Sequence, residues 1–195
     1  MIAAGVPDPS EVRQRVARGR GLFISLDEAV TMPTATVTAR ALQASLGSDV
    51  VVFASPRSRG PVLTVLRLVD DEEATRLRPV LESLVAVFRR TAAALVEQMR
   101  AGMPPGSDDD TDYPESVRYD GATWYLHLHG EHCRFENVAS GEVVEANIYV
   151  PDAVDPYFLL QYAKSAGSHG AVVDACVEGF HDMCRLLDRA GIAYG

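Results

Sequence analysis

The most regular pattern in the chain is an alternation of apolar and polar residues over positions 123–129. Successive side chains of a β-strand point to opposite faces of a sheet, so this alternation predicts a strand with one apolar and one polar face. Gly130 follows as the first residue of a two-residue turn, which predicts a type II′ hairpin that pairs His129 with His132. In this register the apolar residues of both strands share one face of the sheet.

A second turn, over residues 138–141, adds a third strand whose register agrees with that of the hairpin. It places Glu145 opposite Arg134, which predicts an ion pair between the two strands. We call the polar side of this predicted meander the polar face. It comprises the side chains of Tyr125, His127, His129, His132, Arg134, Glu136, Glu145 and Asn147.

Helical periodicity dominates the stretches on either side of the meander. After the acidic run at 70–73, apolar residues recur three and four positions apart and predict one long helix. Its predicted buried stripe consists of Leu77, Leu81, Leu84, Phe88, Ala92, Leu95 and Met99. A polar loop is expected over 106–116, and two further helices over 154–167 and 169–191. The stripe predicted for the last helix consists of Val173, Cys176, Val177, Phe180, Cys184 and Leu187.

The first 70 residues predict a smaller unit, with helices over 11–18 and 34–47 and strands over 21–26, 50–55 and 61–69. The whole chain therefore predicts an α+β fold. A small mixed α/β unit spans residues 1–70. A long helix, a three-stranded antiparallel β-meander and two C-terminal helices follow over residues 71–195, and one continuous domain is the alternative.

Charge is distributed unevenly along the chain, whose formal net charge is -9. Before Asp70 there are eight arginines and five acidic residues, a balance of +3. From Asp70 onward there are ten basic and 22 acidic residues, a balance of -12. Such acidity repels phosphate backbones, so it argues against nucleic acid as a partner and favours cationic proteins or metal ions. The alternative is that the acidity only keeps the protein soluble.

The cysteines and the N-terminal sequence bear on where the protein acts. Cys133, Cys176 and Cys184 are widely spaced and form no CxxC pair, so we expect reduced thiols. The N-terminal segment is charged where a signal peptide would be apolar. No apolar run approaches the roughly 18 residues that a membrane span needs. The expected location is the cytoplasm, without membrane association.

The polar face also permits a chemical interpretation. His127, His129 and His132 lie two residues apart or directly opposite each other in the predicted register, close enough for three imidazoles to meet at one ion. Three histidines with an open fourth position are the ligand set of several catalytic zinc sites, so the candidate cofactor is a divalent transition metal such as zinc. Under this hypothesis Glu136 or Glu145 would orient a ligand or act as a general base. Arg134 would hold an anionic substrate.

Three segments together resemble a family of uncharacterised bacterial proteins. They are the hairpin WYLHLHGEHCRF (124–135), the strand GEVVEANI (141–148) and the helix start DPYFLLQYA (155–163). The specific matches are His129, Gly130, Cys133, Asp155 and Pro156. The resemblance implies no established activity. Small acidic families of this kind often occur beside bacterial toxins as immunity proteins.

Two functions follow from these observations. We favour an acidic cytoplasmic binding protein of the immunity or accessory type, which engages a protein partner through the polar face and its acidic surroundings. The alternative is a small metal-dependent enzyme that uses the three histidines. An ordinary solvated sheet face would have the same composition, because antiparallel sheets commonly expose one side to water.

Overall fold

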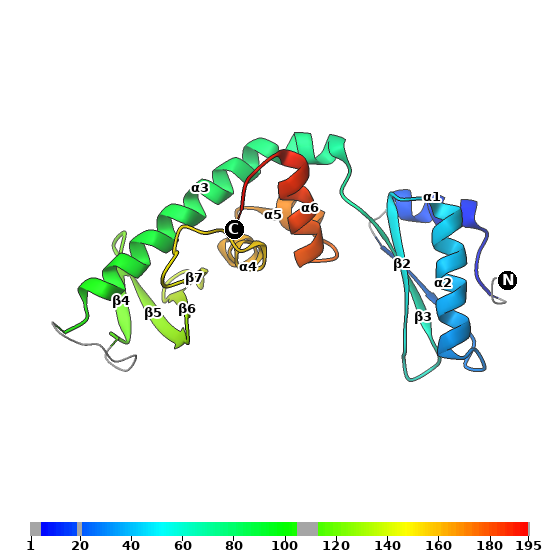
Figure 1. Cartoon of the computed structure of the whole chain (residues 1–195), viewed down its shortest axis with the longest axis horizontal. Helices are drawn as coiled ribbons and strands as arrows, with labels where there is room; N and C mark the ends of the chain where they lie inside the picture. Colours follow the sequence, from blue (N-terminus) through cyan, green and yellow to red (C-terminus); the bar gives the residue numbers. More distant parts are fainter. Residues whose placement is uncertain (1–4, 19–20, 105–112, 195) are drawn as a thin grey trace. The chain divides into compact units, whose positions relative to one another are not determined.

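Residues 5–18, 21–104 and 113–194 are described by the computed structural model of the chain, drawn as a ribbon in Figure 1. The chain forms two compact units, Met1–Asp70 and Asp71–Gly195, and each is described by itself. Both combine helices with an antiparallel sheet, so the predicted α+β class is confirmed. Most of the loop predicted over 106–116 lies outside the described residues.

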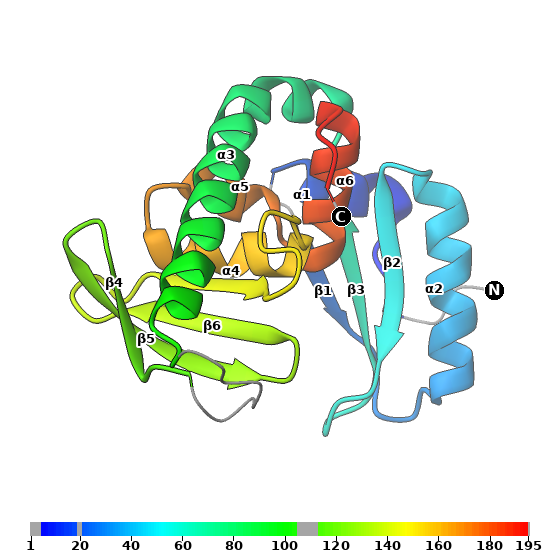
Figure 2. The same ribbon diagram turned by 60° about the vertical axis from the view of Figure 1, so that its left-hand side comes forward.

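The first unit is a three-stranded sheet with two helices on one face. Its elements are α1 (Pro9–Arg18), β1 (Gly21–Ser25), α2 (Met32–Leu46), β2 (Val50–Ser55) and β3 (Val62–Arg67). The strand order is β1-β3-β2, and both pairings are antiparallel. Figure 2 shows α2 running along the sheet, where Leu42 joins Leu63 and Val65 of the central strand in one buried cluster. The helices and strands predicted for this part of the chain are confirmed.

Local capping explains where α2 starts and stops. The hydroxyl of Thr31 accepts a hydrogen bond from the backbone N–H of Thr34, and Pro33 occupies the first turn, where its missing N–H costs nothing. The helix ends at Gly47, whose positive φ of 94° favours glycine.

The second unit is a four-stranded meander covered on one side by helices. The first helix and the strands are α3 (Asp71–Ala101), β4 (Ser116–Tyr119), β5 (Ala122–His129), β6 (His132–Asn137) and β7 (Val143–Asn147). The C-terminal helices are α4 (Pro156–Ala166), α5 (Gly170–Ala175) and α6 (Phe180–Ala190). The strand order β4-β5-β6-β7 follows the sequence, and α3 and α4 both contact strands of this sheet.

Burial on α3 agrees with its apolar periodicity. All seven residues of the predicted stripe are buried. They form the core of this unit together with the inward side chains of the sheet, among them Trp124, Cys133 and Phe135. Because one helix face supplies this much apolar surface, α3 fixes which side of the meander turns inward.

One strand of the meander was missed in the prediction. Residues 116–119 form β4, which makes the meander four-stranded rather than three-stranded. The turn into β5 is Asp120-Gly121, with φ of 49° and 75°. Two consecutive positive φ values are typical of a type I′ hairpin, for which Asp-Gly is a preferred sequence. The strand itself, only four residues long, is too short for its alternation to be read.

The single helix predicted over 169–191 is wrong, because the chain breaks after Cys176 and begins a new helix at Phe180. Gly179 has a φ of 72°, which interrupts the helix. The carboxylate of Asp182 accepts a hydrogen bond from the backbone N–H of Glu178 at 2.8 Å and so supports the break. The apolar face restarts in a new phase, and two residues of the predicted stripe, Val177 and Phe180, are exposed.

Candidate functional site

The polar face has the register that the sequence predicts. His129 pairs with His132, His127 pairs with Arg134, and Arg134 in turn pairs with Glu145 across β6 and β7. Gly130 has a φ of 60°, and Asp120 is the only described non-glycine residue with a positive φ, so the turn is of the predicted II′ type rather than I′. The register prediction is therefore confirmed on both sides of β6.

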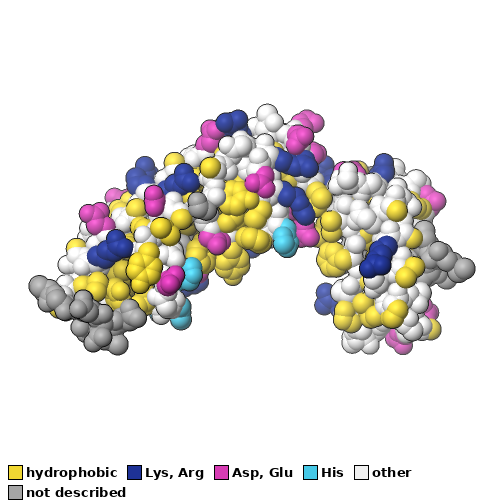
Figure 3. Space-filling model, in the orientation of Figure 1, with side chains coloured by type: hydrophobic (Ala, Val, Ile, Leu, Met, Phe, Trp, Pro, Cys, Tyr) yellow, Lys and Arg dark blue, Asp and Glu magenta, His cyan; other side chains and the backbone are white. Residues whose placement is uncertain are grey.

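The side chains of this face are exposed or half-buried, whereas those of the opposite face are packed under α3 and α4. Tyr125 is 53% exposed, and all three histidines are exposed. Figure 3 shows histidine side chains next to acidic and hydrophobic ones on the surface of this sheet. The meander therefore presents an open, mixed polar and aromatic surface.

Arg134 lies at the centre of this surface and is held by two carboxylates. Its guanidinium is 2.8 Å from Glu145 and 3.8 Å from Glu136. Glu145 is the more buried of the two carboxylates, so its hydrogen bond with Arg134 is the better shielded from water. The two carboxylates hold the long arginine side chain in one place on the sheet. Less conformational entropy of this side chain is then lost when a partner binds to it.

The predicted metal ligands do not assemble as a set of three. Only His129 and His132 are direct partners, since His127 faces Arg134 across the ladder. The ring of His132 instead packs edge-on against Phe158, with ring centroids 5.4 Å apart. Among the described residues, no group of three or more histidine, cysteine or acidic side chains is placed to hold a metal ion.

The residues predicted as catalytic under the metal hypothesis are engaged with each other. Glu136 and Glu145 both lie against Arg134, so the structure brings the three candidate residues together on the polar face. The thiol of Cys133, which lies on the buried side of the same sheet, is unreactive. Burial raises the pKa of Cys133 to about 12, and its Sγ donates to the carbonyl of Ala146 at 3.3 Å.

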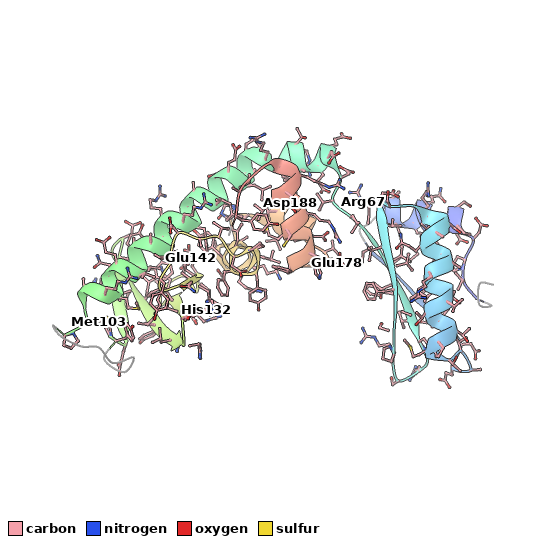
Figure 4. The ribbon with its side chains drawn as sticks, viewed as in Figure 1. Arg67, Met103, His132, Glu142, Glu178 and Asp188 are labelled. Atoms are coloured by element: carbon pink, nitrogen blue, oxygen red, sulfur yellow. The ribbon has the colours of Figure 1, made fainter. Side chains whose placement is uncertain are left out.

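At one end of the polar face lies a pocket of about 390 Å³, which we call the Phe158 pocket. Its lining consists of His132, Asn147, Ala153, Val154, Asp155, Pro156, Phe158 and Tyr194. His132 and Asn147, which are direct partners across β6 and β7, belong to both the polar face and the pocket. Figure 4 labels His132 on the meander. The pocket and the polar face thus form one continuous surface.

Two local motifs shape the wall of the Phe158 pocket. Asp155 caps α4 by accepting hydrogen bonds from the backbone N–H groups of Tyr157 and Phe158, at 2.7 and 3.4 Å. Asn147 accepts from the backbone N–H of Tyr149 at 2.8 Å, which turns the chain out of β7. Partial burial, together with the carboxylate of Asp188, raises the pKa of Tyr194 to about 12.

The aromatic residues around the Phe158 pocket were not identified from the sequence. Tyr149 is 67% exposed, and its backbone N–H donates to Asn147 of the pocket lining. Tyr157 is 49% exposed and lies between two lining residues in sequence, Pro156 and Phe158. The available signal was the run Asp155-Pro156, which marks a helix start and so places the following aromatic residues at an exposed helix end.

Comparison of the chain with models of known families, with curated proteins and with solved structures gives no match. The resemblance noted above on His129, Gly130, Cys133, Asp155 and Pro156 therefore stays a prediction. In the part of the chain that the structure describes, the helices lack the combination of length and apolar character that crossing a membrane requires.

Proposed function

We propose that this protein is a binding protein of the immunity or accessory type, and that it engages a protein partner through the polar face and the Phe158 pocket. The observation that carries the proposal is that the polar face and the Phe158 pocket form one continuous surface. On this surface, an arginine held by carboxylates and several exposed aromatic side chains lie next to a preformed pocket. Tyrosine and arginine are among the residue types enriched in the small set of residues that dominate binding energy at protein interfaces.

The chemistry of the surface favours a basic partner that carries an exposed apolar side chain. The chain from Asp70 onward has a balance of -12, which attracts a cationic protein over distances of about 8 to 10 Å at physiological salt. Phe158, Pro156 and Val154 give the pocket an apolar lining that accepts an aromatic or aliphatic side chain. The acidity would accelerate association, while the pocket and Tyr125 would slow dissociation.

The test uses basic proteins encoded next to this chain, since immunity and accessory proteins are commonly encoded beside their partners. Each is titrated by calorimetry against the purified full chain and against the double variant Tyr125→Ala, Phe158→Ala. We expect one of them to bind the native protein, and the double variant to bind at least about 30-fold more weakly, as loss of interface anchors predicts. Raising the salt concentration from 0.05 to 0.5 M (about tenfold) is expected to weaken binding further.

Arg134→Glu and Arg76→Glu form a matched pair of charge reversals in the same experiment. Arg134 lies in the centre of the polar face, whereas Arg76 is exposed near the start of α3. Weakening by Arg134→Glu alone supports the proposal. Equal effects of the two reversals, or no binding by any of the basic neighbours, would contradict it.

A further inference from the structure

The strand β1 of the first unit presents an open edge of its sheet. The strand order β1-β3-β2 makes β1 and β2 the two edges, as Figure 2 shows. The backbone N–H of Leu26 donates to the carbonyl of Pro61, and in an antiparallel ladder only every second residue bonds to the same neighbour. The N–H and carbonyl groups of Gly21, Phe23 and Ser25 therefore point away from β3. No hydrogen bond within the described part of the chain satisfies them.

The opposite edge of the same sheet is closed by a side chain. The amide of Gln43 donates to the carbonyl of Val50 at 2.9 Å and accepts from the backbone N–H of Val52 at 2.8 Å, so it takes the place of a further strand along β2. Among the described residues, β1 has no such cover. Its sequence GLFIS also lacks the charged residues and prolines that usually protect an edge from pairing. The sheet is therefore open to a further strand at β1.

An exposed aromatic ring lies in the middle of this open edge. Phe23 is 68% exposed. Its neighbours Leu22 and Ile24 pack in the core cluster under the helices, so the ring of Phe23 lies on the opposite face of the sheet. A strand that pairs with β1 brings its own side chains to about 4.5 to 5.5 Å from this position. Pairing would thus cover apolar surface as well as satisfy the backbone groups.

The geometry of β1 is suited to pairing with a second copy of itself. Antiparallel pairing about a two-fold axis at Phe23 places Gly21 of each copy opposite Ser25 of the other, and it places the two Phe23 rings side by side. All three outward residues then have partners. The small residues at both ends leave the aromatic pair in the centre free of steric conflict.

The charges that flank β1 in the sequence fit the same arrangement. Arg18 and Arg20 precede the strand, and Asp27 and Glu28 follow it. An antiparallel pair sets the basic start of one strand beside the acidic end of the other, whereas a parallel pair would bring like charges together. A peptide from an unrelated protein would match this order of charges only by chance. We propose that the protein forms a homodimer through β1, in which two three-stranded sheets join into one.

Sedimentation equilibrium of the full chain, over about 1 to 500 µM, tests for this dimer. Pairing of one strand buries less surface than most stable dimers do, so we expect a reversible monomer–dimer equilibrium with a Kd of about 1 to 100 µM. Raising the salt concentration from about 0.05 to 0.5 M is expected to raise this Kd, because salt screens the flanking charges.

Two matched pairs of variants locate the interface. Phe23→Lys sets two like charges side by side at the two-fold axis and is expected to raise the Kd at least about tenfold. Phe53→Lys, on the same sheet face but on the other edge strand, is expected to change it less than about twofold. Ser25→Pro removes an outward N–H from each copy and is expected to raise the Kd at least about tenfold. Ser25→Ala keeps that N–H and is expected to leave the Kd unchanged.

Sedimentation as a monomer at every concentration would overturn the proposal. Equal weakening by Phe23→Lys and Phe53→Lys would also overturn it, because the copies would then pack face to face, and so would equal effects of Ser25→Pro and Ser25→Ala. Since one pair changes an exposed side chain and the other a backbone group, a folding defect in one leaves the other as a test. The double variant Tyr125→Ala, Phe158→Ala lies in the other unit and is expected to dimerise like the native protein, so the two proposals fail separately.

Discussion

Replacing Phe135 with alanine is expected to lower the free energy of unfolding of the Asp71–Gly195 unit by about 3 to 5 kcal/mol. Phe135 is 0% exposed on β6, and it pairs with Leu126 on one side and with Val144 on the other. Its removal leaves a cavity that the strands cannot fill without breaking their hydrogen bonds. Equilibrium denaturation in urea, followed by the fluorescence of Trp124, measures the change, because the only tryptophan lies in this unit.

Tyr125→Ala is the matched control for this experiment. It removes a ring of similar size from the neighbouring strand, but from the polar face, and is expected to cost less than about 1 kcal/mol. A register shifted by one residue would exchange the two faces and so reverse the two results. A larger loss for Tyr125→Ala than for Phe135→Ala would therefore contradict the strand pairing itself.

Three of the four strands of the meander could be predicted because two independent constraints agree on them. The alternation over 123–129 sets which residues share a face, and the turns at Gly130 and at 138–141 set which residues pair. A slip of one residue would bury Arg134 and expose Phe135, so the pattern allows only one register. Local information is sufficient here, since a hairpin is determined by residues that are close in sequence.

The outcome for the histidines shows where this local information ends. Their shared face follows from the strand period, but convergence on one ion depends on neighbours from other elements. The ring of His132 packs against Phe158, a residue of α4 that lies 26 positions away in sequence. The alternation along a strand carries no information about a contact with a distant helix. It therefore predicts that the Cβ atoms of the three histidines lie close together, but not the directions in which their imidazole rings point.

The Phe158 pocket could not be predicted for a related reason. It collects side chains from the ends of β6 and β7, from residues 153–155, from α4 and from Tyr194, which only the packing of the unit brings together. Within the strand pattern, His132 was one polar position among several.

The break between α5 and α6 depends on a small buried network around Asp182. This carboxylate is 1% exposed and accepts from the backbone N–H of Glu178 at 2.8 Å. The guanidinium of Arg185 lies 2.8 Å from Glu178 and 3.3 Å from Asp182, so it balances the negative charge of both. A buried charge is tolerated when it is paired and hydrogen-bonded in this way, and its loss leaves the partners unsatisfied.

Asp182→Ala is therefore expected to lower the free energy of unfolding by about 2 to 4 kcal/mol, because the Glu178 N–H and Arg185 both lose their shared acceptor. Asp182→Asn keeps one acceptor oxygen and is expected to cost less, whereas Asp174→Ala, at an exposed position of α5, is expected to change the free energy by less than about 0.5 kcal/mol. Urea denaturation measures all three, and hydrogen exchange at Glu178 reports the cap directly. If Asp182→Ala were as stable as Asp174→Ala, the buried network would not be what fixes the break, and Gly179 alone would have to account for it.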